Sequence, residues 1–170
     1  MKVLVLSNTP WANDNSFGNS FSNIFDGILE LEFANIYCRA GKPNNQFKMR
    51  YFQITEKSLL DNLKNTNKHS GEEVFLEDKK YDKSYGKGYD QARKMKWQIF
   101  YWGRNLIWKI GRWKSKQLNA FLDEFSPDII FQPVYYSTYI NDIALYIKEY
   151  TKKPMIGYIS DDNYTLRQFL

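Results

Sequence analysis

The sequence has very few of the residues that form disulfides and zinc sites. Its 170 residues include a single cysteine, Cys38, and a single histidine, His69. One chain therefore cannot form an internal disulfide or a Cys/His zinc site, and a Ser-His-Asp triad is excluded unless His69 serves it. We expect His69, in a polar loop, to be an ordinary surface residue, and Cys38 to be a small residue buried in apolar surroundings.

Long hydrophobic runs are also missing. The apolar run near the N-terminus covers residues 3–6 (VLVL) and stops at Ser7-Asn8. This is far short of the roughly 18 residues that span a bilayer, and it is too short for the core of a signal peptide. The run fits a first buried strand. We predict a cytoplasmic protein that is either soluble or peripheral on the inner face of the membrane.

Acidic residues are absent from residues 91–122, here called the basic segment. This segment holds eight of the 24 lysines and arginines and four of the five tryptophans. The chain as a whole has a net charge of +5, but outside the basic segment 16 basic residues face 19 acidic ones, a net of −3. A mildly acidic domain with one strongly basic segment is therefore expected.

Short apolar strands alternate with amphipathic helices. The pattern predicts strands at residues 2–6, 32–37, 50–54, 128–131 and 155–159, and helices capped by Asn19 or Ser20 and by Thr55, along the basic segment, at 136–150 and from Tyr164. Strands that are apolar on both faces predict an α/β fold, with an open parallel Rossmann-like sheet between helices in a three-layer α/β/α arrangement. Residues 1–170 are expected to form a single domain with a surface excursion at 64–90.

The basic segment shows two stripes when it is placed on a helix. The first is apolar and predicts contact with the core; it comprises Met95, Ile99, Trp102, Leu106, Ile110 and Trp113. The second, the outer stripe, sets aromatic rings among cations; it comprises Lys94, Trp97, Tyr101, Arg104, Trp108 and Arg112. Three explanations of the outer stripe stay open: cover by neighbouring elements, contact with anionic lipid headgroups, or binding of nucleic acid. No nucleic-acid motif supports the third, so no such partner is expected.

Ligands of open α/β sheets bind beyond the carboxyl ends of the strands. The residues expected there to bind substrate are polar or aromatic: Asn8, Thr9, Trp11, Phe17, Gly18, Gln132, Tyr135, Tyr136 and Asn163. Asp161 and Asp162 follow the fifth strand, where a carboxylate can act as a general base towards a hydroxyl, or can cap a helix. Aromatic rings and carboxylates together suit a sugar or another polyol. No second glycine follows Gly18 at the spacing of the GxGxxG motif, so a classical dinucleotide-binding site is not expected.

Four segments carry a family resemblance. They are residues 2–10 (KVLVLSNTP), 17–19 (FGN), 126–131 (SPDIIF) and 153–162 (KPMIGYISDD). Together they resemble the N-terminal domain of GT-B fold, family-4-like bacterial glycosyltransferases. The resemblance implies one half of a GT-B architecture, which binds the acceptor, while a C-terminal domain that this sequence lacks binds the nucleotide sugar. Many members have a histidine after the fifth strand, where this chain has Ser160-Asp161-Asp162.

The function implied by this resemblance is transfer of a sugar to a cell-surface polysaccharide or glycolipid precursor. This half would be inactive alone, and Asp161 or Asp162 would act as the base or orient the acceptor. The implied partners are a sugar or lipid-linked acceptor, the C-terminal donor-binding domain and an anionic membrane surface contacted by the outer stripe. No metal and no cofactor are expected, since the nucleotide sugar is a substrate. The alternative function is a non-catalytic α/β binding module that docks on membrane or nucleic acid through the basic segment.

Overall fold

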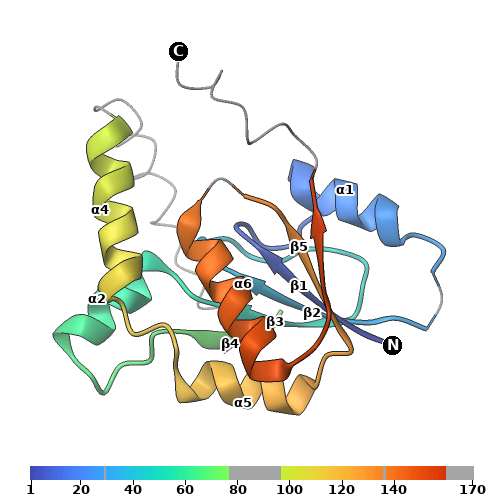
Figure 1. The fold of residues 1–170 in the computed structure, drawn as a ribbon. Helices are drawn as coiled ribbons and strands as arrows, with labels where there is room; N and C mark the ends of the chain where they lie inside the picture. The colour runs from blue at the N-terminus through green and yellow to red at the C-terminus, as the bar shows by residue number, and fades with distance from the viewer. Residues whose placement is uncertain (29, 77–96, 136, 160–170) are drawn as a thin grey trace.

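The computed structural model describes residues 1–170 except 29, 77–96, 136 and 160–170 (Figure 1). A six-stranded sheet has the order β4-β3-β2-β1-β5-β6. Its strands are β1 (Lys2–Ser7), β2 (Glu32–Tyr37), β3 (Met49–Gln53), β4 (Glu72–Val74), β5 (Ile129–Pro133) and β6 (Met155–Tyr158). All neighbours are parallel except β3 and β4. The α/β prediction is confirmed with one correction: β4 adds an antiparallel strand at the edge.

The order of the parallel strands is consistent with a Rossmann-like fold. From β1 the chain proceeds outwards through β2 to β3, and it later returns to pair β5 with the other side of β1. The strand order therefore reverses between β1 and β5, which is the position where open α/β sheets bind ligands.

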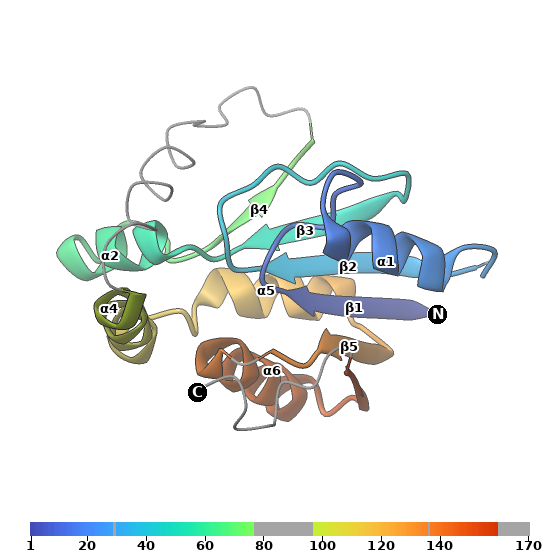
Figure 2. The same ribbon diagram turned by 90° about the horizontal axis from the view of Figure 1, so that it is seen from above.

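Helices cover both faces of the sheet. The helices are α1 (Ser16–Phe25), α2 (Glu56–Lys64), α4 (Trp97–Ile110), α5 (Lys116–Phe125) and α6 (Thr138–Thr151). Figures 1 and 2 show α1 on one face and α5 and α6 on the other, with α2 and α4 at the carboxyl ends of the strands. None of the described helices is long and apolar enough to cross a membrane.

Alternate residues of the strands supply two separate cores. Leu4 and Leu6 of β1 join a large cluster beneath α4, α5 and α6, whereas Val3 and Val5 join a smaller cluster beneath α1. Because successive side chains of a strand point to opposite faces, a strand between two helical layers must be apolar at every position. This explains the unbroken apolar run of residues 3–6.

Several boundaries differ from the sequence prediction. Helix α1 is capped by Asn15, whose side chain accepts a hydrogen bond from the Gly18 backbone, not by Asn19 or Ser20. The predicted cap at Thr55 is confirmed, and a reciprocal bond with Ser58 completes a capping box. The predicted helix from Tyr164 and residues 77–90 of the predicted excursion lie outside the described residues. The described part of the excursion contains β4.

The basic segment is not one continuous helix. Helix α4 ends at Ile110, and Ser115 caps a new helix, α5, through a bond from the Leu118 backbone. Gly111 lies at the break, where an added Cβ would lie 2.6 Å from the carbonyl oxygen of Ile107. The close approach of the chain at this turn therefore requires glycine.

In the part of α4 whose side chains the structure describes, residues 103–110, the two faces are exchanged relative to the prediction. Trp108 of the outer stripe is only 2% exposed, whereas Leu106 and Ile110 of the predicted core stripe are 57% and 53% exposed. Trp113, beyond the helix, is buried as expected. The assignment of Trp108 and Arg104 to an exposed, membrane-facing stripe is thus wrong, since the Arg104 side chain is also only 14% exposed. At these two residues, cover by neighbouring elements is the correct explanation. The other stripe residues lie outside the description: Lys94 and Met95 entirely, and Trp97, Ile99, Tyr101 and Trp102 in their side chains.

Candidate functional site

Polar side chains gather at the carboxyl ends of the strands, on both sides of the reversal between β1 and β5. We call this group the carboxyl-end cluster. Its members come from the ends of β1, β2 and β5, from the first turns of α2 and α6, and from α4: Asn8, Cys38, Arg39, Tyr135, Glu56, Tyr139 and Arg104. The backbone N–H of Cys38 donates to the carbonyl oxygen of Asn8, which ties the ends of β1 and β2 together.

Tyr139 lies at the centre of the cluster. Its hydroxyl donates to Oδ1 of Asn8 at 2.6 Å and accepts a hydrogen bond from the guanidinium of Arg104. The indole of Trp108 stacks on the phenol ring, with ring centroids 4.4 Å apart, and the Arg104 guanidinium lies 4.6 Å from the ring centroid. Arg104 and Trp108 are one turn apart on α4, so both reach the same ring.

Glu56 anchors α4 to α2. Its Oε1 accepts a hydrogen bond from the indole nitrogen of Trp108 at 3.0 Å and lies 3.3 Å from Nε of Arg104. Glu56 is also the first residue of α2, where a negative charge interacts favourably with the helix dipole. The inward position of Trp108 and Arg104 therefore follows from their polar atoms, which find partners inside the protein.

Burial sets the protonation of the cluster. The pKa of the Cys38 thiol is raised mainly by complete burial, with the negative charge of Glu56 as the next cause. The pKa values of the Tyr135 and Tyr139 phenols are also raised, again mainly by burial. At neutral pH all three groups are protonated, so the cluster offers hydroxyl donors and a guanidinium, but Cys38 is not a thiolate nucleophile.

Arg39 gives the cluster a further cation. Its carbonyl oxygen accepts a bond from the Gln53 side chain, which fixes the backbone at the end of β2. Its Nε atom is buried and has no hydrogen-bond partner among the described residues, although the residue as a whole is half-buried. A buried guanidinium nitrogen without a partner carries a desolvation cost that an acceptor on a bound ligand would remove.

Two of the predicted substrate-binding residues belong to this cluster. Asn8 is 8% exposed and holds Tyr139, and a hydrogen bond from the Asn8 backbone reaches the half-buried Tyr135 hydroxyl. Thr9 is half-buried beside them, and its carbonyl oxygen accepts a bond from Ser7. Gln132 is 6% exposed, and its side chain donates to Asn141 of α6, a bond that ties β5 to α6.

Three other predicted residues serve packing on the α1 face, which corrects their assignment. Trp11 is fully buried, and Phe17 packs edge-on against its ring with centroids 6.5 Å apart. A Cβ on Gly18 would lie 2.0 Å from the carbonyl oxygen of Ala12, so α1 approaches this loop only through a glycine. The contact of α1 with the loop thus accounts for all three residues without a ligand.

The remaining predicted residues, Tyr136, Asp161, Asp162 and Asn163, lie outside the described residues. His69 is exposed and Cys38 buried, as expected. Sequence reasoning missed Arg39, Glu56 and Tyr139. Ligands bind beyond the carboxyl ends of the strands, and Arg39 and Glu56 follow the second and third strands, so the same reasoning applied to those strands would have found both residues. Tyr139 gives no such signal, because it lies within a predicted helix.

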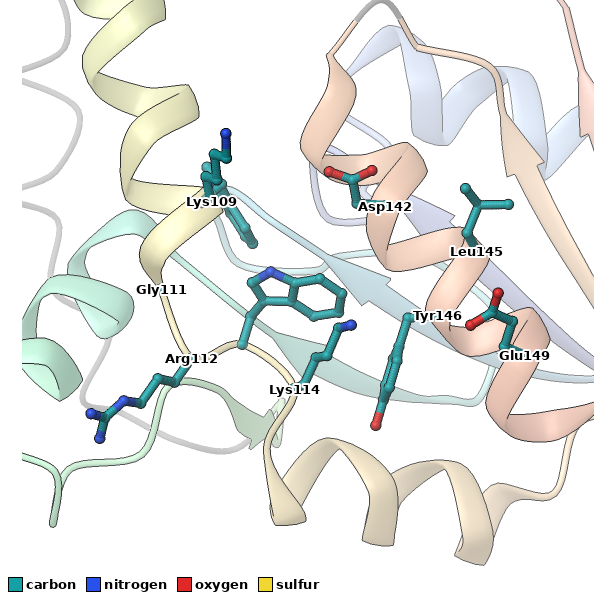
Figure 3. Close-up of a pocket in the computed structure, with 10 residues that line it drawn as sticks. Lys109, Gly111, Arg112, Lys114, Asp142, Leu145, Tyr146 and Glu149 are labelled. Atoms are coloured by element: carbon teal, nitrogen blue, oxygen red, sulfur yellow. The ribbon is translucent and has the colours of Figure 1, made fainter.

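A groove runs beside the cluster between the end of α4 and α6 (Figure 3). Its volume is about 580 Å³. Acidic residues of α6 form one wall, and the rest of the lining is mainly basic and aromatic; the charged residues are Lys109, Arg112, Lys114, Asp142 and Glu149. Lys114 lies over the rings of Trp113 and Tyr146, at 5.3 and 5.1 Å from their centroids.

Comparison with known proteins identifies no relative: no family model, curated protein or solved structure matches this chain. Within the described part of the chain, no three His, Cys, Asp or Glu side chains are grouped so that they can hold a metal ion.

Proposed function

We propose that this chain is the acceptor-binding half of a glycosyltransferase that moves a sugar from a nucleotide sugar to a polysaccharide or glycolipid precursor. The observation that carries the proposal is the carboxyl-end cluster at the reversal of strand order. Its half-buried rim offers the groups that bind a hydroxylated or phosphorylated acceptor, because Arg39 supplies donors and the Tyr135 hydroxyl can donate or accept. The four resembling segments support the same conclusion.

In this proposal the chain positions the acceptor and a second domain brings the donor. Arg39 binds an acceptor oxygen, while Tyr139, held by Asn8 and Arg104, keeps the floor of the site in place. Asp161 or Asp162 follows β6 in sequence and serves as the base that takes the proton from the attacking hydroxyl, or orients that hydroxyl. We place the enzyme peripherally at the inner face of the membrane, where lipid-linked acceptors are accessible.

The test is a transfer assay on protein expressed from the complete reading frame. The protein is incubated with radiolabelled UDP-, GDP- and dTDP-sugars and with the lipid and polysaccharide fractions of the cells that encode it. We expect label to move from one donor to one fraction, and Asp161→Asn or Asp162→Asn to lower kcat by about a hundredfold. Transfer from none of the donors would overturn the proposal in favour of a binding module. Normal kcat in both variants would overturn the base assignment.

A further inference from the structure

The outward face of α4 combines aliphatic and cationic side chains. Leu106 and Ile110 are one turn apart and more than half exposed, and Lys109, between them in sequence, is also exposed. Arg104 and Trp108 point to the opposite side of the helix, into the protein. Burying a leucine side chain stabilises a protein by about 1.5–3 kcal/mol. Helix α4 forgoes this gain at Leu106 and Ile110 and turns Arg104 and Trp108 inwards instead, which calls for an explanation.

The cations beside this face are available to an external anion. Lys109 and Arg112 are exposed, and neither forms an ion pair with a carboxylate in the part of the chain that the structure describes. In Figure 3 Arg112 points away from the acidic wall of the groove. The basic segment contains no acidic residue, so nothing within it offsets these charges.

The chemistry of this face fits lipid better than nucleic acid. Single strands are bound by aromatic rings that stack on bases, but the two tryptophans of the basic segment whose side chains the structure describes, Trp108 and Trp113, are 2% and 8% exposed and cannot take part. Aliphatic side chains flanked by lysine and arginine instead match the boundary between acyl chains and anionic headgroups.

From these observations we propose that Leu106, Ile110, Lys109 and Arg112 form a docking surface for an anionic lipid bilayer. Leu106 and Ile110 enter the headgroup region, and Lys109 and Arg112 bind lipid phosphates. Helix α4 stands at the carboxyl ends of the strands (Figure 1), so docking brings the carboxyl-end cluster close to the bilayer surface. The inference rests on the proposed membrane location and not on the chemistry of sugar transfer.

Vesicle co-sedimentation of the 170-residue chain tests this surface. The probes are vesicles of phosphatidylcholine alone and of phosphatidylcholine with phosphatidylglycerol. We expect binding to the anionic vesicles that weakens with salt. Lys109→Gln with Arg112→Gln should weaken it about fivefold for each charge removed, or about 25-fold together. Leu106→Ser and Ile110→Ser should each weaken it about tenfold or more.

The matched control is Ile28→Ser, since Ile28 is 52% exposed beside α1, close to the 53% of Ile110. Circular dichroism melts of every variant should coincide with that of the wild type, because the altered side chains are exposed. Equal binding to both kinds of vesicle, or equal loss in Ile28→Ser and Ile110→Ser, would overturn the proposal. So would binding to single-stranded RNA in place of vesicles. Sugar transfer to a detergent-dispersed acceptor does not depend on docking. Loss of vesicle binding with normal transfer would therefore count against the docking surface alone, and normal vesicle binding without transfer would count against the proposed enzyme alone.

Discussion

The loop after β1 and the carboxyl-end cluster are neighbours that use their side chains in opposite ways. The loop and α1 enclose an aromatic cluster of Trp11, Phe17, Phe21, Phe25, Phe33, Phe47 and Phe131, in which the indole of Trp11 lies 5.4 Å from the rings of Phe33 and Phe47. The carboxyl-end cluster instead buries hydroxyl, amide, carboxylate and guanidinium groups in one connected network.

The difference separates residues that build the fold from residues that are free to bind. Apolar burial stabilises a protein directly, whereas burying charged groups is costly unless each finds a partner, and even then it is often close to neutral. The aromatic cluster is thus explained by stability alone. The carboxyl-end cluster is not, and this makes it the better candidate for function. Four measurements can break or sharpen this contrast.

The largest effect is expected in the aromatic cluster. Trp11→Ala should lower the free energy of unfolding by about 4 kcal/mol, because it leaves a large cavity among the five phenylalanine rings that contact Trp11. Urea denaturation followed by circular dichroism measures this change. Trp11→Phe serves as the control and should cost less, since it keeps a ring in the cavity. A loss below about 1 kcal/mol for the alanine variant would show that Trp11 is not a core residue.

A smaller loss is expected for the anchor of α4. Glu56→Ala removes the acceptor of the Trp108 indole and the ion-pair partner of Arg104, and should cost about 2 kcal/mol. The expected loss of stability is no larger because the Glu56 side chain is 30% exposed, so solvent screens its ion pair with Arg104. Glu124→Ala is the control, since Glu124 pairs with Arg50 while its side chain is 65% exposed. Equal losses in the two variants would contradict the structural role given to Glu56.

Tyr139→Phe should cost about 1 kcal/mol at neutral pH, because it removes the hydroxyl bonds to Asn8 and Arg104. Burial raises the pKa of Tyr139 above its ordinary value of 10.0. Above that pH the unfolded phenol ionises while the folded one does not, so the wild type should lose stability as pH rises. Urea denaturation at increasing pH should show a shallower alkaline loss in the variant. Identical slopes would contradict the burial of this hydroxyl.

The sequence predicted the sheet well and the surface of α4 poorly, for a physical reason. Strand positions follow from local apolar runs, so they can be predicted without knowing which elements pack on the strands. The facing of α4 depends on Glu56 and Tyr139, which are distant in sequence and provide partners for the polar atoms of Trp108 and Arg104. Because the Trp108 indole hydrogen-bonds to Glu56 and the Arg104 guanidinium contacts Tyr139 and Glu56, these two side chains face inwards while Leu106 and Ile110 face outwards. Similarly, Trp11 follows a strand end as a ligand-binding residue would, yet α1 covers it.

The most direct test of the carboxyl-end cluster as an acceptor site is Arg39→Gln, which separates binding from stability. The complete protein is assayed for sugar transfer to the lipid fraction, with Lys42→Gln, an exposed neighbour beyond the same strand, as the control. We predict that neither variant lowers the free energy of unfolding by more than about 0.5 kcal/mol, because Lys42 is exposed and the Nε atom of Arg39 has no hydrogen bond among the described residues to lose. For Arg39→Gln alone, we predict a KM for the acceptor raised about tenfold or more, with the KM for the nucleotide sugar unchanged. An unchanged acceptor KM in a folded Arg39→Gln protein would contradict the account.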